Sequence, residues 1–165
     1  MRVREDIARF DWWPMNRSHF SQTTEHWGTP KAVYEGLNSE FNFDFDPCPM
    51  NSATDGLSPM TIWSGRRVYC NPPYGHGLAK WLERGLEASL AVFLLPARTD
   101  TKWFHDIVLP KAKEIRFVRG RIKFREKDPT WKPGSGTAPF PSMIVVFGKD
   151  ELSEHDSTCG CAKEK

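Results

Sequence analysis

The chain has 165 residues, 39% of them hydrophobic, which suffices for one globular core and leaves no room for a second large domain. Its formal net charge is only +2, but residues 111–132 contain nine Lys or Arg against three acidic residues. This local excess favours a polyanionic ligand bound at one place, with a solvated basic surface as the alternative. Because no signal peptide and no apolar run of about 20 residues are present, we expect a cytoplasmic protein without a membrane span.

The two ends of the chain differ in composition from its middle. Residues 1–25 have mixed charge without a sustained period, and residues 150–165 are polar. We therefore predict a poorly ordered lead-in and a polar tail around a single domain over residues 26–149. The tail contains Cys159 and Cys161, but this pair offers too few ligands for a structural metal, so we predict no metal site.

The first regular elements are predicted between residues 29 and 47. Thr29 suits the N-cap of a helix and Pro30 its first position. The buried face of this helix is marked by apolar residues at helical spacing, namely Val33, Tyr34, Leu37 and Phe41. Residues 43–46 alternate between apolar and polar and predict a short strand that ends at Pro47.

The middle of the chain predicts two strands, each followed by a helix. Residues 68–70 and 91–95 form apolar runs of strand length, separated from the first strand by a loop over residues 50–64. The first helix is marked by apolar residues at helical spacing, namely Leu78, Trp81, Leu82, Leu86 and Leu90. The second helix is expected to be capped by Thr99 or Asp100 and to end before Pro110. Its apolar residues are Trp103, Phe104, Ile107 and Val108. This alternation is typical of an α/β sheet with parallel strands.

The end of the domain predicts antiparallel pairing. Residues 115–118 and 122–124 suit two strands that meet at a hairpin or bend over residues 119–121, and residues 143–147 suit a last apolar strand. Alternation in the second strand points Ile122 and Phe124 inward and the neighbouring charges outward. Residues 127–141 are rich in Pro, Gly and Ser, and we expect a loop that is mobile without ligand.

A polar turn follows the strand at residues 68–70. Its sequence is Asn-Pro-Pro-Tyr-Gly at residues 71–75, and the two adjacent prolines cannot continue a buried strand. The chain must leave the sheet at its carboxyl edge, where α/β proteins bind ligands. There the turn presents an amide, carbonyl acceptors and an aromatic ring, which together can hold a planar amino group by hydrogen bonds and stacking.

Six short blocks in one order include this turn. They are His-Trp-Gly-Thr-Pro at 26–30, Asp-Phe-Asp-Pro-Cys-Pro at 44–49, Trp-Ser-Gly at 63–65, Asn-Pro-Pro-Tyr-Gly at 71–75, Leu-Leu-Pro-Ala-Arg-Thr-Asp-Thr at 94–101 and Ala-Pro-Phe-Pro-Ser-Met at 138–143. In these blocks the chain closely resembles the small phage-encoded DNA N6-adenine methyltransferases of the Dam-like family. Since the resemblance begins near Met15, we expect residues 1–14 to be an extension before an alternative start. The resemblance implies a compact, abbreviated Rossmann-like methyltransferase sheet with a C-terminal antiparallel hairpin.

The resemblance also implies an activity: transfer of a methyl group from S-adenosylmethionine to N6 of adenine in double-stranded DNA. It assigns catalysis to residues 71–74, that is Asn71, Pro72, Pro73 and Tyr74. In this interpretation the Asn71 oxygen and the Pro72 carbonyl accept hydrogen bonds from N6, and the ring of Tyr74 stacks on the extruded base.

Cofactor contacts are implied in the same way. The cofactor residues are expected to be Trp27, Thr29, Pro30, Asp46, Pro47 and Cys48, although the usual Gly-rich turn is missing and Asp46 could instead serve as a turn residue before Pro47. From charge and position, the DNA-binding residues are expected to be Arg98, Arg119, Arg121, Lys123 and Lys132. For Arg98, the cofactor carboxylate and an ion pair to an acidic residue are the alternatives. No obligate protein partner is indicated.

Other substrates remain open at this point. The same turn serves methylation of RNA adenine, of cytosine N4 and of protein glutamine, because each presents a planar amino group. A catalytically inactive DNA-binding relative is a further alternative, suggested by the missing Gly-rich turn.

Overall fold

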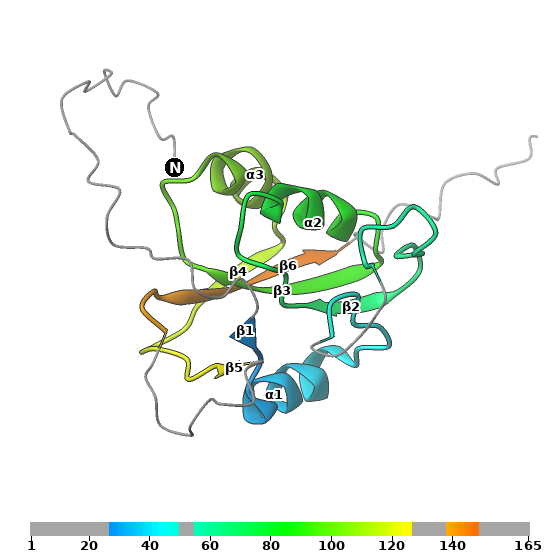
Figure 1. Cartoon of the computed structure of the whole chain (residues 1–165). Coiled ribbons are helices and arrows are strands. Elements are labelled where there is room, and N and C mark those ends of the chain that lie inside the picture. The colour runs from blue at the N-terminus through cyan, green and yellow to red at the C-terminus, as the bar shows by residue number, and fades with distance from the viewer. Residues whose placement is uncertain (1–26, 50–54, 127–137, 149–165) are drawn as a thin grey trace, which may run out of the picture.

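The structure is a computed structural model that describes residues 27–49, 55–126 and 138–148. The predicted lead-in, the tail and most of the 127–141 loop lie outside the described residues. At its centre is a four-stranded mixed sheet in the order β2-β3-β6-β4 (Figure 1). The strands are β2 (Arg67–Cys70), β3 (Leu90–Pro96), β6 (Ser142–Gly148) and β4 (Glu114–Phe117). The α/β class is confirmed, and this sheet is compatible with a small methyltransferase fold.

Strand direction brings two polar loops to the same edge of the sheet. β2 and β3 are parallel, with Tyr69 opposite Val92 and Cys70 opposite Phe93. Their carboxyl ends therefore lie side by side, and both the turn at residues 71–75 and the loop after Pro96 begin there. β6 runs antiparallel between β3 and β4 and closes the other half of the sheet.

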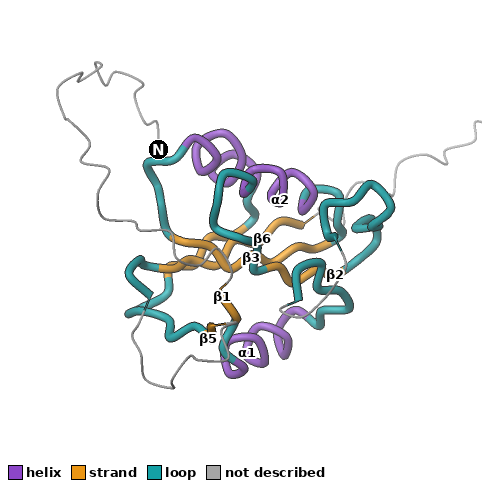
Figure 2. The backbone as a smooth tube through the Cα atoms, viewed as in Figure 1, coloured by secondary structure: helices purple, strands orange, loops and turns teal. Residues whose placement is uncertain are grey.

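Helices cover both faces of the sheet (Figures 1 and 2). On one face lie α2 (Leu78–Gly85) and a helical stretch composed of η1 (Phe104–Val108) and α3 (Leu109–Lys111). On the other face lie α1 (Lys31–Phe41) and the small antiparallel pair of β1 (Trp27–Gly28) and β5 (Arg125–Glu126). Within the described part of the chain, no helix is long and apolar enough to span a membrane.

Alternation along the strands divides the core in two. Val68, Cys70 and Phe93 point to the α2 side, where they pack with Trp81 and Leu82 of that helix. The alternate residues of the strands, such as Tyr69 and Val92, point to the α1 side. The core cluster on that side contains Leu37, Tyr69, Val92, Leu94, Ile122, Phe124, Phe140, Ile144 and Val146. Because successive residues of a strand face opposite ways, Tyr69 and the residue two positions later share the α1 side.

The predicted C-terminal hairpin is wrong in its pairing. β4 pairs with β6, and residues 122–124 form no strand, although Ile122 and Phe124 are buried as the alternation predicted. All of residues 142–147 are buried, so β6 needs neighbours on both edges and faces. β4, which is only partly buried, fills the edge position beside β6.

Three other boundaries differ from the prediction. Thr29 does not cap α1, whose N-cap position is occupied by Pro30 without a side-chain hydrogen bond. Leu90 begins β3 instead of ending α2. The second helix runs through Pro110 to Lys111. Because proline lacks an N–H and crowds the carbonyl four residues earlier, the wider π-helical turn just before it accommodates the ring.

The strand predicted at residues 43–46 is reduced to a single bridge. Phe45 pairs in parallel with Val68, and its carbonyl accepts a hydrogen bond from the Tyr69 N–H at 3.0 Å. The Asp44 side chain accepts from the N–H of Arg67 at 3.1 Å. This segment therefore continues the sheet beyond β2 and brings Asp46 to the edge that carries the turn at residues 71–75.

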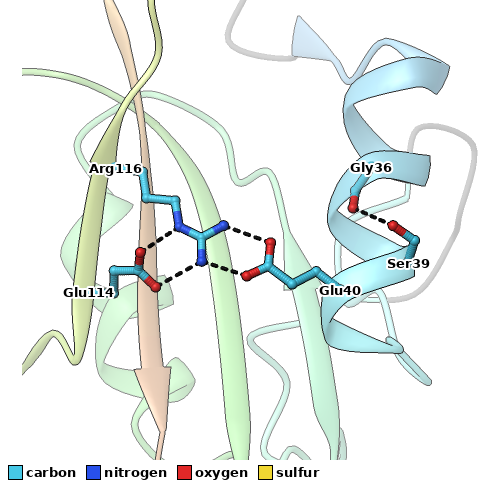
Figure 3. A network of polar contacts seen from close by, with 5 residues as sticks. All are labelled: Gly36, Ser39, Glu40, Glu114 and Arg116. Atoms are coloured by element: carbon cyan, nitrogen blue, oxygen red, sulfur yellow. Dashed lines mark hydrogen bonds and ion pairs between the residues drawn. The ribbon is translucent and has the colours of Figure 1, made fainter.

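Arg116 joins the edge strand β4 to α1 (Figure 3). Its guanidinium donates to both carboxylate oxygens of Glu40 at 2.6 and 2.7 Å, and to both of Glu114 at 2.6 and 2.8 Å. The same view shows Ser39 donating to the Gly36 carbonyl within α1. The hydrogen bonds from Arg116 hold the pKa of Glu40 below its usual value. One cation of the basic segment is thus neutralised inside the fold, so the charge count from sequence overstates what is available to a ligand.

Candidate active site

Asn71 lies at the end of β2 with both ends of its amide engaged. Its Nδ2 donates to Thr29 Oγ1 at 3.0 Å, and its Oδ1 accepts from the Tyr74 hydroxyl at 2.7 Å. Thr29 Oγ1 also lies 2.6 Å from the Tyr69 hydroxyl. The tertiary structure therefore joins three residues predicted from sequence to one that was not, over a separation of 42 residues between Thr29 and Asn71.

The other residues of the turn are packed to different degrees. Pro72 is buried, whereas Pro73 and Tyr74 are partly exposed. The Tyr74 ring contacts Phe140 edge to face at 5.5 Å and Phe124 at 6.3 Å. Its hydroxyl also lies 3.3 Å from the Leu94 carbonyl. Burial raises the pKa of this phenol well above its ordinary value, so the group is a neutral hydrogen-bond donor.

A cavity of about 300 Å³ opens beside Tyr74. It is lined by Tyr74, Gly75, His76, Leu78, Ala79, Pro96, Arg98 and Trp103, which come from the ends of β2 and β3 and the starts of the helices that follow. This volume is at the lower end of the range typical of ligand pockets, about 300–1,000 Å³. Aromatic side chains and a guanidinium in one small cavity suit a planar ring that carries a negatively charged neighbour.

The start of α1 faces this network through Thr29. Thr29 and Pro30 are partly buried, and no side chain caps the helix. Uncapped N–H groups at a helix start attract carboxylates. The backbone of Trp27 lies in β1, and its side chain is outside the described residues.

Asp46 is a partly buried carboxylate with one hydrogen bond. Its Oδ1 accepts from the Cys48 N–H at 2.9 Å, so the turn role predicted as the alternative is present. Burial raises the pKa of Asp46 above its ordinary value, and this bond offsets only part of that effect. Among the described residues, no Lys or Arg forms an ion pair with it. The carboxylate can therefore accept a further donor from a ligand.

The loop around Asp46 is fixed by close packing. Pro47 is wholly buried, and Gly56 lies so close to it that a methyl group at Gly56 would sit 2.3 Å from the Pro47 carbonyl oxygen. Cys48 is partly buried and Cys70 is fully buried. Burial raises the pKa of the Cys70 thiol well above its ordinary value, so this thiol is an unreactive part of the core.

The predicted DNA-binding residues lie in two places. Arg98 lines the cavity, whereas Arg119, Arg121 and Lys123 are exposed on the segment after β4. That segment turns at Gly120, whose φ of +82° favours glycine. Its buried face reaches the turn, because Phe124 contacts Tyr74. Lys132 lies outside the described residues.

Sequence reasoning missed three residues near the turn. Tyr69 could have been found, because it precedes Asn71 by two positions in a strand and so shares its face. His76 and Trp103 line the cavity, but no sequence pattern links them before the fold is known. In the part of the chain that the structure describes, no cluster of potential metal ligands is present.

Comparison with protein families adds an independent observation. A family model described as DNA N-6-adenine-methyltransferase (Dam) matches residues 17–158. The match spans every described residue, including Thr29, Asp46 and the turn at residues 71–74. Comparisons with curated proteins and with solved structures gave no match.

Proposed function

This chain belongs to the DNA N-6-adenine-methyltransferase (Dam) family, and from that premise we propose that it transfers a methyl group from S-adenosylmethionine to N6 of adenine in double-stranded DNA. One observation supports this most directly: the Asn71 amide is held by hydrogen bonds at both ends, and one of its partners, Tyr74, lines a cavity of about 300 Å³. The proposed catalytic residues are Asn71, Pro72, Pro73 and Tyr74, in the turn at the carboxyl edge of β2.

The chemical task is to make an unreactive amine attack. The lone pair of N6 is delocalised into the purine ring, whereas S-adenosylmethionine, when bound, supplies a methyl group already activated by a sulfonium. Asn71 Oδ1 is a carbonyl-type acceptor that the Tyr74 hydroxyl holds in place. Asn71 Oδ1 and the Pro72 carbonyl are proposed to accept the two N6 hydrogens of the bound adenine and so to favour a tetrahedral nitrogen. Methyl transfer would form the N–C bond as the S–CH3 bond of the sulfonium breaks and leaves a neutral thioether, and these acceptors would stabilise the positive charge on nitrogen until one N6 proton is lost to solvent.

The residues at the start of α1 and around Asp46 fit the amino-acid end of the cofactor. A carboxylate suits the uncapped helix start next to Thr29 and Pro30. An ammonium or hydroxyl group suits Asp46, whose buried carboxylate has one backbone donor. We therefore assign cofactor contacts to Trp27, Thr29, Pro30, Asp46, Pro47 and Cys48.

DNA is proposed to approach from the side of the cavity. N6 is paired and stacked inside a duplex, so the adenine must be extruded before it can reach Asn71. Tyr74 and Trp103 offer ring contacts in the cavity, and Arg98 offers a cation for a phosphate. Arg119, Arg121 and Lys123 are exposed on the segment whose Phe124 contacts Tyr74, and they are proposed to contact the backbone of the duplex, together with Lys132.

The test is transfer of a radiolabelled methyl group to duplex DNA, followed by digestion to nucleosides. We expect the label in N6-methyladenine, and we expect Asn71→Ala to lower the rate by at least about 10²-fold while the chain still binds S-adenosylmethionine. Asn42→Gly is the matched control, because it changes an asparagine outside the cavity whose φ of 49° glycine accepts readily. Label in cytosine, in RNA alone or in protein would contradict the proposed substrate, and binding of DNA without any transfer would favour an inactive relative.

A further inference from the structure

A continuous line of polar groups runs from the core to the turn. It begins at the Tyr69 hydroxyl, passes through Thr29 Oγ1 at 2.6 Å and the Asn71 amide at 3.0 Å, and ends at the Tyr74 hydroxyl at 2.7 Å. Tyr69 is 2% exposed and its ring is fixed by Tyr34 at 5.1 Å and Phe43 at 5.4 Å. The inner end of the line is therefore rigid, and the outer end is Tyr74, a residue that lines the cavity.

The chemistry of each group sets its part in this line. An amide NH2 can only donate, so Thr29 Oγ1 must accept from Asn71. A hydroxyl oxygen has two lone pairs, so Thr29 can accept from Asn71 and still be bonded to Tyr69. Thr29 is only partly buried and lies outside the main sheet, and among the described residues its side chain bonds to Tyr69 and Asn71. Tyr69 consequently fixes the position of the Thr29 hydroxyl, and Thr29 fixes the Asn71 amide.

We infer that Tyr69 and Thr29 are positioning residues that hold the Asn71 amide so that its Oδ1 faces the amine to be methylated. This inference rests on the proposed function of Asn71. It gives Thr29 a second task beside the proposed cofactor contact, and it gives Tyr69 a role beyond packing. Alignment of this kind matters because small displacements of a catalytic group lower reaction rates steeply.

The Tyr69 hydroxyl is suited to a constant positioning role. Burial raises the pKa of this phenol well above its ordinary value, although the hydrogen bond with Thr29 works in the opposite direction. The hydroxyl therefore keeps its proton at neutral pH. Removing it should change the rate without changing the shape of the pH–rate profile.

Tyr69→Phe tests the inference, since it removes one hydroxyl and leaves the ring in place. We expect kcat to fall about tenfold, as for loss of one net hydrogen bond in the active geometry, with KM for DNA and Kd for S-adenosylmethionine unchanged. Tyr34→Phe is the matched control: it alters a neighbouring ring of the same cluster whose hydroxyl has no hydrogen bond among the described residues, and it should leave kcat unchanged.

A double variant separates positioning from general destabilisation. Thr29→Val should lower kcat at least as much as Tyr69→Phe, and Thr29→Ser should restore it, because serine keeps the hydroxyl. If Tyr69 acts through Thr29, the Tyr69→Phe/Thr29→Val double variant will have the kcat of Thr29→Val alone. Additive losses, or a Tyr69→Phe enzyme with the kcat of Tyr34→Phe, would overturn the inference. Should Tyr69→Phe fail to fold, the Thr29→Val and Thr29→Ser pair still decides whether the hydroxyl at this position controls kcat.

A second measurement keeps this inference separate from the proposed function. The side-chain NH2 resonances of Asn71, identified by their loss in Asn71→Ala, report its hydrogen bond to Thr29 without any substrate. We expect these protons to exchange faster with solvent in both Tyr69→Phe and Thr29→Val than in Tyr34→Phe. If the wild-type protein transfers no methyl group to DNA, the proposed function fails, and the exchange rates alone decide whether Tyr69 holds the amide. If transfer occurs but exchange is the same in all variants, only the inference fails.

Discussion

Gly56→Ala tests the placement of the cofactor loop. The added methyl group would lie 2.3 Å from the Pro47 carbonyl oxygen, 2.8 Å from Pro47 Cβ and 2.7 Å from the Trp81 ring. Ordinary contacts of this kind begin at 3.4 Å, so backbone or ring must move by about 1 Å. Pro47 is buried to below 2% exposure and Trp81 to 8%, so there is no free space to absorb the shift. The loop that carries Asp46 must be displaced.

Two consequences follow for the Gly56→Ala protein. Overpacking of this kind costs about 1–3 kcal/mol of unfolding free energy, to be measured by urea denaturation. Displacement of the loop by about 1 Å should also weaken binding of S-adenosylmethionine at least tenfold, or about 1.4 kcal/mol, as measured by calorimetry.

Gly85→Ala is the matched control for this prediction. Its methyl group would lie 2.3 Å from the Phe93 ring, so the overpacking is similar, but Gly85 ends α2 whereas the cavity lies at the start of that helix. We expect comparable destabilisation with unchanged cofactor affinity. If both variants bind S-adenosylmethionine as the wild type does, the residues around Asp46 do not contact the cofactor.

Three further predictions concern charge and backbone. Asp46→Asn keeps the acceptor for the Cys48 N–H but removes a carboxylate whose pKa is raised by burial. In the wild type this carboxylate lowers the stability as pH rises above the ordinary Asp range, and in the variant that loss should be absent. The variant should therefore melt at a higher temperature at neutral pH, and it should bind S-adenosylmethionine less well. Gly36→Ala, in the interior of α1 with no atom within 4 Å of the new methyl group, should add about 0.5–1 kcal/mol to the unfolding free energy, and a loss would show that the helix is strained there. Arg121→Ala and Lys123→Ala should each reduce the slope of log affinity for duplex DNA against log salt by about 0.9, and an unchanged slope would mean that these side chains are merely solvated.

Local chemistry predicted much of the framework. The apolar runs before Asn71 and at residues 91–95 were confirmed as parallel strands, because a buried strand is read from composition and length alone. The two prolines after Asn71 end β2 where expected, because proline cannot continue a sheet. The inward positions of Ile122 and Phe124 were also confirmed, since alternation is a property of the extended backbone.

Long-range pairing was less accessible. The hairpin predicted within residues 115–124 assumed that neighbours in sequence pair, whereas β4 pairs with β6 across the intervening loop. The sequence contained part of this information, because the largely apolar β6 suits a central position and the charged β4 suits an edge. Which strand fills an edge is decided by packing of the whole sheet, and a short segment does not contain that information.

The sequence by itself determined the chemical groups at the edge of the sheet: an amide, two prolines and a tyrosine that must leave the strand together. Only the tertiary structure decided how the amide is held, because Thr29 is 42 residues away from Asn71 and reaches it through the docking of α1 against the sheet. The same holds for the bond between Arg116 and Glu40, which are separated by 76 residues. Hydrogen bonds between distant residues depend on distances and angles that exist only once the apolar faces have packed, and this is why sequence names the reacting groups while the fold sets their geometry.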